Sequence, residues 1–316
     1  MPVYQNIELN GIDIGEGQDK KYSKFCNEGK WDNFINPLLP EDCQERTFVE
    51  MGCNAGLFLK MAKEKGFDRV IGVEASRSAY KVGLEYKAQN GLNYEIMNQT
   101  IGEGFVYDLP MADVTVMSNF HYHLDFPNFY PLIDRMRFKT IYCLVVSARV
   151  TDAHWKPSWQ MNAVRHYFKD WQEIKAVYPI EVENDPHSRE EMYGILFKSP
   201  LERVNISDIW NKKDNGKYVG NDIPTNEFAR QVIENESFDF MESNYYKAVY
   251  KMRESKWKED KIIKFVKAKY DLMYSIKRGG LKSPIYLRLD NKIADGGHRK
   301  AMIEELGYKS IIARRV

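Results

Sequence analysis

Cysteine is scarce in this chain, and the few cysteines are far apart. The chain has four, at Cys26, Cys43, Cys53 and Cys143, and no two of them form a C-x-x-C pair. A small disulfide-stabilised scaffold needs a denser set of cysteines. The sequence therefore excludes that class and predicts an intracellular protein with reduced thiols.

Long apolar runs are also absent. No stretch approaches the roughly 20 apolar residues that span a bilayer. The first residues, MPVYQNIELN, lack a basic region followed by an apolar one, so no secretory signal is evident. We expect a cytoplasmic protein with no membrane partner, and no sequence feature specifies an oligomeric state.

Net charge is nearly absent, at +1, but the charges are unevenly distributed. Between Tyr245 and Val316 the chain has 19 Lys/Arg and 8 Asp/Glu, so the remainder is acidic. Such an excess suits a nucleotide or nucleic-acid partner at the basic C-terminal end. A solvated helix face rich in lysine accounts for the same counts, and both interpretations stay open.

The stretch TFVEMGCNAGLFLKMAKEKGFDRVIGVEAS, residues 47–76, has the pattern of a strand, a glycine turn, a helix and a second strand. Thr47 to Met51 and Val70 to Val73 are the apolar strand segments. Apolar residues at helical spacing follow the turn, and Gly66 is a typical helix stop. Such a unit predicts a parallel sheet with a right-handed crossover.

The turn reads E-x-G-x-x-x-G, which differs from the G-x-G-x-x-G of dinucleotide-binding proteins. Gly52 and Gly56 permit positive φ. Glu50 disfavours a phosphate and suits a ligand with a positive amino group, whereas Glu74 is placed to accept hydrogen bonds from ribose hydroxyls. A cationic amino acid joined to a nucleoside is S-adenosylmethionine, so these residues predict that cofactor. The competing interpretation is a tight turn in an unrelated α/β protein.

Further elements are expected along the first 200 residues. The sequence predicts helices at Arg77–Asn90 and Pro131–Phe138, parallel strands at Tyr94–Met97, Asp113–Met117 and Ile141–Ser147, and a closing antiparallel pair, Ile174–Tyr178 with Met192–Lys198. Ligands of open α/β sheets bind beyond the carboxyl ends of the strands. Gln99 and Asn119 lie at such ends, as do the turn and Glu74.

Two further segments, KWDNFINPLLPEDCQERTFVEMGCNAGLF and MSNFHYHLDFP, carry a closer likeness. Over about residues 5 to 200 the chain resembles class I methyltransferases of the tRNA wobble-uridine carboxymethoxy type, with Glu50 in place of their Asp and His121 in place of their Leu. The resemblance implies a Rossmann-like sheet and S-adenosylmethionine as cofactor. Some members of the family use the carboxylated form of the cofactor, which requires extra basic pocket residues that are not evident in this sequence, so plain methyl transfer is expected. Together with the pattern, the resemblance indicates these cofactor-binding residues: Glu50, Gly52, Cys53, Asn54, Gly56, Glu74, Ala75, Gln99 and Asn119.

The segment His121-Tyr122-His123 follows the strand whose end should face the methyl acceptor. All three are candidate catalytic residues. On extended backbone the two histidines point the same way, and we expect one of them to line the acceptor pocket and accept a proton. A structural histidine at a strand end is the alternative. No third ligand accompanies the pair, so no metal site is predicted.

Ser199-Pro200 is the expected domain boundary. It separates a methyltransferase domain, residues 1–200 with a lead-in at 1–46, from a smaller α+β domain, residues 201–316. In the second domain the sequence predicts helices at Lys261–Arg278 and His298–Leu306 and strands at Ile285–Leu289, Lys292–Ala294 and Ser310–Arg315.

The C-terminal block resembles the ParB/sulfiredoxin superfamily, through a glycine turn followed by H-R at a helix start. Gly297 stands where sulfiredoxins have a catalytic cysteine, so reductase chemistry is not expected. A helix N-terminus beside a guanidinium suits a phosphate, and ATP or CTP with Mg²⁺ is the nucleotide considered. The alternative is an ordinary helix cap. The predicted phosphate-binding residues are Asp295, Gly296, Gly297, His298 and Arg299.

Three hypotheses for function follow. The first is an S-adenosylmethionine-dependent methyltransferase acting on a nucleotide or nucleic-acid-related acceptor, with phosphate or nucleotide binding by the second domain. The second is a small-molecule methyltransferase whose second domain is regulatory or a second enzyme. The third is a non-enzymatic nucleic-acid-binding adaptor.

Overall fold

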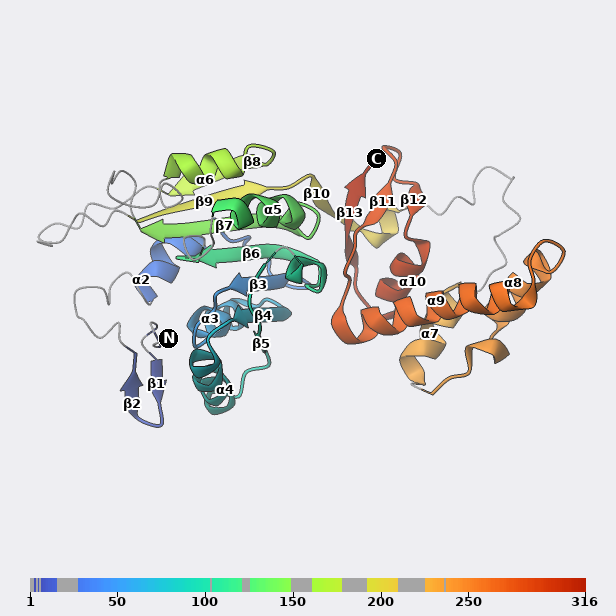
Figure 1. The fold of residues 1–316 in the computed structure, drawn as a ribbon, viewed down its shortest axis with the longest axis horizontal. Helices are drawn as coiled ribbons and strands as arrows, with labels where there is room; N and C mark the ends of the chain where they lie inside the picture. The colour runs from blue at the N-terminus through green and yellow to red at the C-terminus, as the bar shows by residue number, and fades with distance from the viewer. Residues whose placement is uncertain are drawn as a thin grey trace, which may run out of the picture. The chain divides into compact units, whose positions relative to one another are not determined.

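The structure is a computed structural model that describes residues 3, 5, 7–15, 28–102, 104–120, 126–148, 161–177, 192–209, 225–235 and 237–316. The chain divides into two compact units, Met1–Pro200 and Leu201–Val316. Each unit contains its own large β-sheet (Figure 1). No helix within these ranges has both the length and the apolar composition required of a membrane span.

Within the described residues, unit 1 is built on a seven-stranded sheet. Its strands in chain order are β3 (Thr47–Met51), β4 (Arg69–Glu74), β5 (Glu95–Asn98), β6 (Ala112–Ser118), β7 (Thr140–Ala148), β8 (Gln172–Val177) and β9 (Met192–Lys198). The order across the sheet is β5-β4-β3-β6-β7-β9-β8, with β9 antiparallel to both neighbours and the strands from β5 to β7 parallel. The strand order reverses between β3 and β6, where doubly wound sheets bind their ligands.

Both faces of this sheet are covered. Helices α3 (Leu57–Lys65) and α4 (Arg77–Asn90) contribute to one core, and α5 (Phe126–Met136) and α6 (Met161–Tyr167) contribute to the other. Strand β3 contributes side chains to both cores, because Phe48 lies in the first core while Val49 and Met51 lie in the second. Unit 1 is therefore a three-layer, Rossmann-like α/β fold.

The lead-in folds onto the first core. It consists of a hairpin, β1 (Ile7–Leu9) with β2 (Ile12–Ile14), then α2 (Glu28–Lys30), the π-helical turn η2 (Trp31–Ile35) and the 3₁₀ turn η3 (Asn36–Leu38). Trp31 packs on Phe58 of α3 with ring centroids 6.2 Å apart. The hairpin had no sequence prediction, because its strands are only three residues long.

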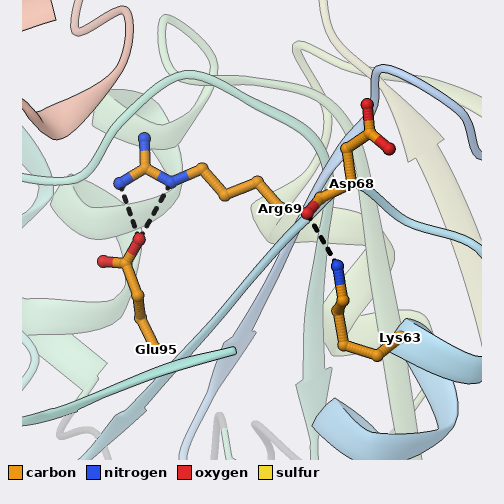
Figure 2. A network of polar contacts seen from close by, with 4 residues as sticks. All are labelled: Lys63, Asp68, Arg69 and Glu95. Atoms are coloured by element: carbon orange, nitrogen blue, oxygen red, sulfur yellow. Dashed lines mark hydrogen bonds and ion pairs between the residues drawn. The ribbon is translucent and has the colours of Figure 1, made fainter. Parts of the chain in front are cut away.

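Polar contacts join the first strands at their amino ends. The Arg69 guanidinium lies 3.0 Å from the Glu95 carboxylate and so links β4 to β5, while Lys63 Nζ donates to the Asp68 carbonyl at 2.8 Å (Figure 2). These contacts lie at the opposite end of the strands from the glycine turn. They fix α3 and β5 on β4 without approaching the candidate site.

The predicted elements of unit 1 are confirmed to within one or two residues at the strands and at the helix Arg77–Asn90. The expected start of the next helix at Pro131 is wrong, because α5 begins at Phe126 and contains Pro131. Proline favours the first turn of a helix. However, Phe129 and Leu132, which precede and follow Pro131 in the sequence and share one face of the helix, are completely buried. Burial of this apolar face outweighs the hydrogen bond that proline removes.

Unit 2 has a four-stranded mixed sheet of order β10-β13-β11-β12 among its described residues. The strands are β10 (Leu201–Asn205), β11 (Ile285–Leu287), β12 (Ile293–Asp295) and β13 (Ser310–Arg315), and the helices are α7 (Thr225–Glu234), α8 (Asn244–Arg253), α9 (Glu259–Gly279) and α10 (Gly297–Glu305). Helix α9 packs on α7, α8 and α10. The α+β arrangement agrees with the prediction, whereas the likeness to ParB stays a prediction.

Candidate functional site

The glycine turn after β3 is held against the end of β4. The backbone N–H groups of Gly52 and Cys53 both donate to the Val73 carbonyl, at 2.8 and 3.0 Å. Gly52 has φ +74°, and a Cβ there would lie 2.9 Å from the Phe120 ring. Glycine is therefore needed both for the positive φ expected from the sequence and for the protein's own packing against Phe120.

Glu74 closes the turn from the end of β4. Its carboxylate accepts the Asn54 N–H at 2.8 Å on one oxygen and the Ser76 N–H at 2.7 Å on the other. Asn54 itself adopts φ +50°, a left-handed conformation that asparagine tolerates. Each carboxylate oxygen keeps a second lone pair. Glu74 therefore organises the turn and retains acceptor capacity for a hydroxyl.

Glu50 is a buried carboxyl at the end of β3, with 1% of its surface exposed. Burial raises the pKa of the Glu50 carboxyl to about 8, with Lys30 opposing and Glu74 adding to the rise. Its Oε2 atom has no hydrogen-bond partner among the described residues. A buried carboxyl with an unsatisfied oxygen is costly, and a bound cation would relieve that cost.

Lys30 supplies positive charge that acts on Glu50. It is buried, with 5% exposed, and its Nζ lies 6.0 Å from the centroid of the Phe58 ring. Its charge lowers the Glu50 pKa without cancelling the effect of burial. The site thus combines two carboxyls, Glu50 and Glu74, with one buried lysine.

The remaining predicted cofactor residues lie around the same strand ends. Gln99 follows β5, and its N–H donates to the Glu74 carbonyl at 3.1 Å. The Asn119 N–H donates to the Val146 carbonyl at 2.8 Å just beyond β6. Ala75 is exposed next to Glu74, and Gly56 caps α3 with φ +86°. The structure therefore brings the turn, Glu74, Gln99 and Asn119 to one edge of the sheet.

Cys53 is placed differently from the other predicted residues. Its side chain is fully buried, and burial raises the pKa of its thiol well above the ordinary value. A Cβ at Gly72 would lie 2.5 Å from the Cys53 sulfur. The side chain therefore packs into the core beside β4, and only its backbone belongs to the turn.

The predicted catalytic segment, His121, Tyr122 and His123, lies outside the described residues. Their predicted roles stay hypotheses. The described residue before them is Phe120, whose side chain is 9% exposed and covers the glycine turn. In the described part of the chain, no group of three His, Cys, Asp or Glu is placed to hold a metal ion.

Sequence reasoning missed Lys30, Phe120 and Gly72. Lys30 belongs to a segment 20 residues before Glu50, and no local pattern connects them. Phe120 touches Gly52 only because β3 and β6 are adjacent. Gly72 reads as an ordinary strand residue, although a Cβ there would also lie 2.4 Å from Leu59.

The predicted phosphate site of unit 2 begins α10. Gly296 is the N-cap with φ +102°, so the first N–H groups of the helix are available at its start. The Arg299 guanidinium forms an ion pair with Asp295 at 2.7 Å through Nη2, while Nε is buried without a hydrogen-bond partner in the described structure. The five predicted residues therefore lie together at one helix end.

His298 is held inside unit 2. Its ring nitrogen Nε2 is hydrogen-bonded to the Tyr245 hydroxyl. Burial, with the charge of Lys269 adding, lowers the pKa of His298 to about 4. The imidazole is therefore neutral at pH 7 and faces a tyrosine, so backbone N–H groups and Arg299 are what this helix end offers to an anion.

The sequence matches no protein-family model, and no curated protein sequence matches it. Solved structures do resemble the chain. TehB from Haemophilus influenzae is 17% identical at a TM-score of 0.43, covering 57% of this chain and 67% of its own. The N-methyltransferase NodS from Bradyrhizobium japonicum WM9 is 14% identical at 0.43, covering 58% and 98%. A SAM-dependent methyltransferase from Aquifex aeolicus is 15% identical at 0.40, covering 56% and 96%. At these identities none of them identifies a function for this chain, which must come from the site itself.

Proposed function

We propose that unit 1 is a class I methyltransferase domain that uses S-adenosylmethionine and acts on a nucleotide or nucleic-acid-related acceptor. The observation that carries this proposal is the buried Glu50 carboxyl with its unsatisfied Oε2. It lies where the strand order reverses, which is the binding position of doubly wound sheets. A ligand with a positive amino group fits this carboxyl better than a phosphate does.

The residues present fit the cofactor. Glu50 would bind the ammonium group, and the second lone pairs of the Glu74 carboxylate would accept the ribose hydroxyls. When bound, S-adenosylmethionine supplies a methyl group on a sulfonium leaving group. The remaining task of the protein is to align the acceptor and exclude water.

The acceptor side of the proposal rests on the two histidines. His121 and His123 follow β6 in the sequence, and Phe120 just beyond β6 covers the turn at Gly52. An oxygen or carbon nucleophile must lose a proton as it takes the methyl group, and one imidazole would accept it. An acceptor that already carries a lone pair would need only positioning.

Calorimetry with S-adenosylhomocysteine tests the cofactor assignment. We expect binding by the full chain, a loss of about tenfold or more in Glu50→Gln (about 1.4 kcal/mol), and no change in the matched control Glu85→Gln on the exposed side of α4. Absence of binding by the wild-type protein would contradict the proposal and favour a non-enzymatic adaptor. Methyl incorporation into RNA or DNA, or only into small molecules, then separates the two enzymatic hypotheses.

A second candidate function concerns unit 2, which we propose binds a phosphate-bearing ligand, ATP or CTP with Mg²⁺, at the start of α10. The buried, unsatisfied Nε of Arg299 supports it. We expect Arg299→Ala to abolish nucleotide binding in titrations of the full chain, with Arg278→Ala as the matched control. Equal nucleotide binding by both variants would show that this helix end is an ordinary cap. A requirement for Mg²⁺ in nucleotide binding would favour a catalytic role for unit 2.

A further inference from the structure

Five side chains in unit 2 alternate between cations and aromatic rings. They are spaced four residues apart, from the end of α8 into α9, and we call them the cation–aromatic ladder: Arg253, Trp257, Lys261, Phe265 and Lys269. Arg253 Cζ and Lys261 Nζ lie 4.8 and 4.6 Å from the centroid of the Trp257 ring. Lys261, Phe265 and Lys269 belong to α9, the long helix drawn in orange in Figure 1.

The rest of the ladder continues the same contacts. Lys269 Nζ lies 5.2 Å from the centroid of the Phe265 ring, and the Phe265 ring meets the Trp257 ring edge-on at 5.6 Å. Each cation therefore sits over a ring, and the two rings touch. Contacts of this kind orient the rings even at a surface.

The ladder is separate from the hydrophobic core of unit 2. Helix α9 packs into the core through other residues, namely Ile262, Val266, Met273 and Ile276. In contrast Trp257 and Phe265 are only partly buried, and Lys261 is exposed. Arg253 and Lys269 are likewise half-buried, so each ladder side chain keeps part of its surface in solvent.

Charge on this segment is strongly positive. Between Lys251 and Arg278 the chain has ten Lys/Arg and four Asp/Glu. Of these acids, Asp271 is paired with Lys267 at 2.9 Å, and Glu259 forms a hydrogen bond with Tyr246. Asp271 therefore pairs outside the ladder, and positive charges remain in clear excess along the segment.

The ladder ends beside the start of α10. Lys269, its last member, lies close enough to His298 for its charge to lower the pKa of that imidazole. Helices α9 and α10 also pack directly on one another. A chain bound along the ladder would therefore have one end near Gly297 and Arg299.

We propose that the cation–aromatic ladder binds single-stranded nucleic acid, with bases stacking on Trp257 and Phe265 and phosphates meeting Arg253, Lys261 and Lys269. Rings accept bases only where the bases are unpaired, and alternating charges follow a phosphate backbone. A membrane-binding helix instead places its apolar residues and its cations on opposite faces. This inference rests on the proposed function, because the bound strand would carry the proposed nucleic-acid-related acceptor. The binding itself can be measured without methyl transfer.

Fluorescence titration of the full chain with short single-stranded RNA and DNA tests the proposal, with the matching duplexes and anionic phospholipid vesicles as comparison ligands. We expect wild-type protein to prefer single strands. Trp257→Ala should weaken that binding about tenfold at unchanged charge, and Trp257→Phe should restore most of it. Lys261→Glu should weaken it more than Lys267→Glu, which makes the same charge change on another side of α9.

Each alternative result overturns the proposal. Equal losses in Lys261→Glu and Lys267→Glu, with no loss in Trp257→Ala, would mean non-specific attraction by net charge. Preference for vesicles would mean a membrane-surface helix. S-adenosylhomocysteine binding is measured in the same preparations. If every ladder variant keeps that binding while the nucleic-acid results contradict the ladder, this inference fails and the proposed cofactor binding of unit 1 does not.

Discussion

The backbone N–H of Asn54 donates to a carboxylate oxygen of Glu74 at 2.8 Å, across 20 residues of sequence. The bond joins the turn after β3 to the end of β4. A residue singled out for ligand binding thus also holds together the loop that would surround the ligand. Effects of its mutation on folding and on binding must therefore be separated.

Glu74→Ala should weaken S-adenosylhomocysteine binding by roughly 1.5–3 kcal/mol, since it removes hydrogen bonds to a charged acceptor. It should also lower stability, because the N–H groups of Asn54 and Ser76 lose their acceptor. Glu74→Gln keeps one carbonyl oxygen and should be less damaging in both respects. Calorimetry and thermal unfolding measure the two effects, and a normal affinity in Glu74→Ala would remove this residue from the binding site.

Gly52→Ala should destabilise unit 1 by about 1–3 kcal/mol through strain at positive φ and the contact with Phe120. The double variant with Phe120→Leu should recover only the part due to the contact. A double-mutant cycle on unfolding free energies gives that coupling. Strictly additive losses would show that Phe120 does not restrict position 52.

Glu50 should make stability fall as pH rises. Its folded pKa is about 8, above the ordinary value of 4.5, so between these values the folded state binds more protons than the unfolded state. The stabilisation is complete below about pH 4.5 and is lost as pH rises to about 8. Glu50→Gln should remove this slope from the unfolding transition that S-adenosylhomocysteine shifts. An identical slope in the variant would assign it to another group.

His298 should have the opposite effect on unit 2. Its pKa of about 4 lies below the ordinary 6.5, so acid protonates the unfolded state first. Stability should fall as pH drops from about 6.5 to about 4, and His298→Gln should flatten this dependence. Tyr245→Phe should cost about 0.5–1.5 kcal/mol through the lost hydrogen bond. Amide hydrogen exchange in α10 and β13 measures the stability of unit 2 in both experiments. A stability of unit 2 that does not change between pH 6.5 and 4 would contradict the lowered pKa of His298.

His121→Ala and His123→Ala should each leave S-adenosylhomocysteine affinity nearly unchanged. At least one should lower turnover on an identified acceptor about a hundredfold or more if an imidazole accepts the proton. The bell-shaped or sigmoidal pH profile of turnover should change in that variant. Normal turnover in both variants would leave these histidines with a structural role only.

Local patterns were sufficient to predict much of unit 1. The turn from Gly52 to Gly56 and the helix Arg77–Asn90 were predicted correctly, because short-range spacing and end signals determine them. Lys30 beside Glu50, and Phe120 over Gly52, depend on contacts made only after distant segments pack. Pro131 inside α5 shows burial overriding a local preference. In unit 2, the contacts between cations and the Trp257 and Phe265 rings had no sequence prediction, because they become visible only once α8 and α9 are placed.

The position of β9 has a consequence for synthesis of the chain. Strand β7 pairs with β6 on one edge and with β9 on the other, yet β9 ends at Lys198, 50 residues after β7 ends at Ala148. While those residues are being translated, the β7 edge is an exposed template for pairing with other chains. Gly194 of β9 also lies where a Cβ would be 2.9 Å from the Phe34 carbonyl of the lead-in. The last strand of this sheet to be synthesised therefore both joins β8 to β7 and packs against the lead-in, which is synthesised well before it.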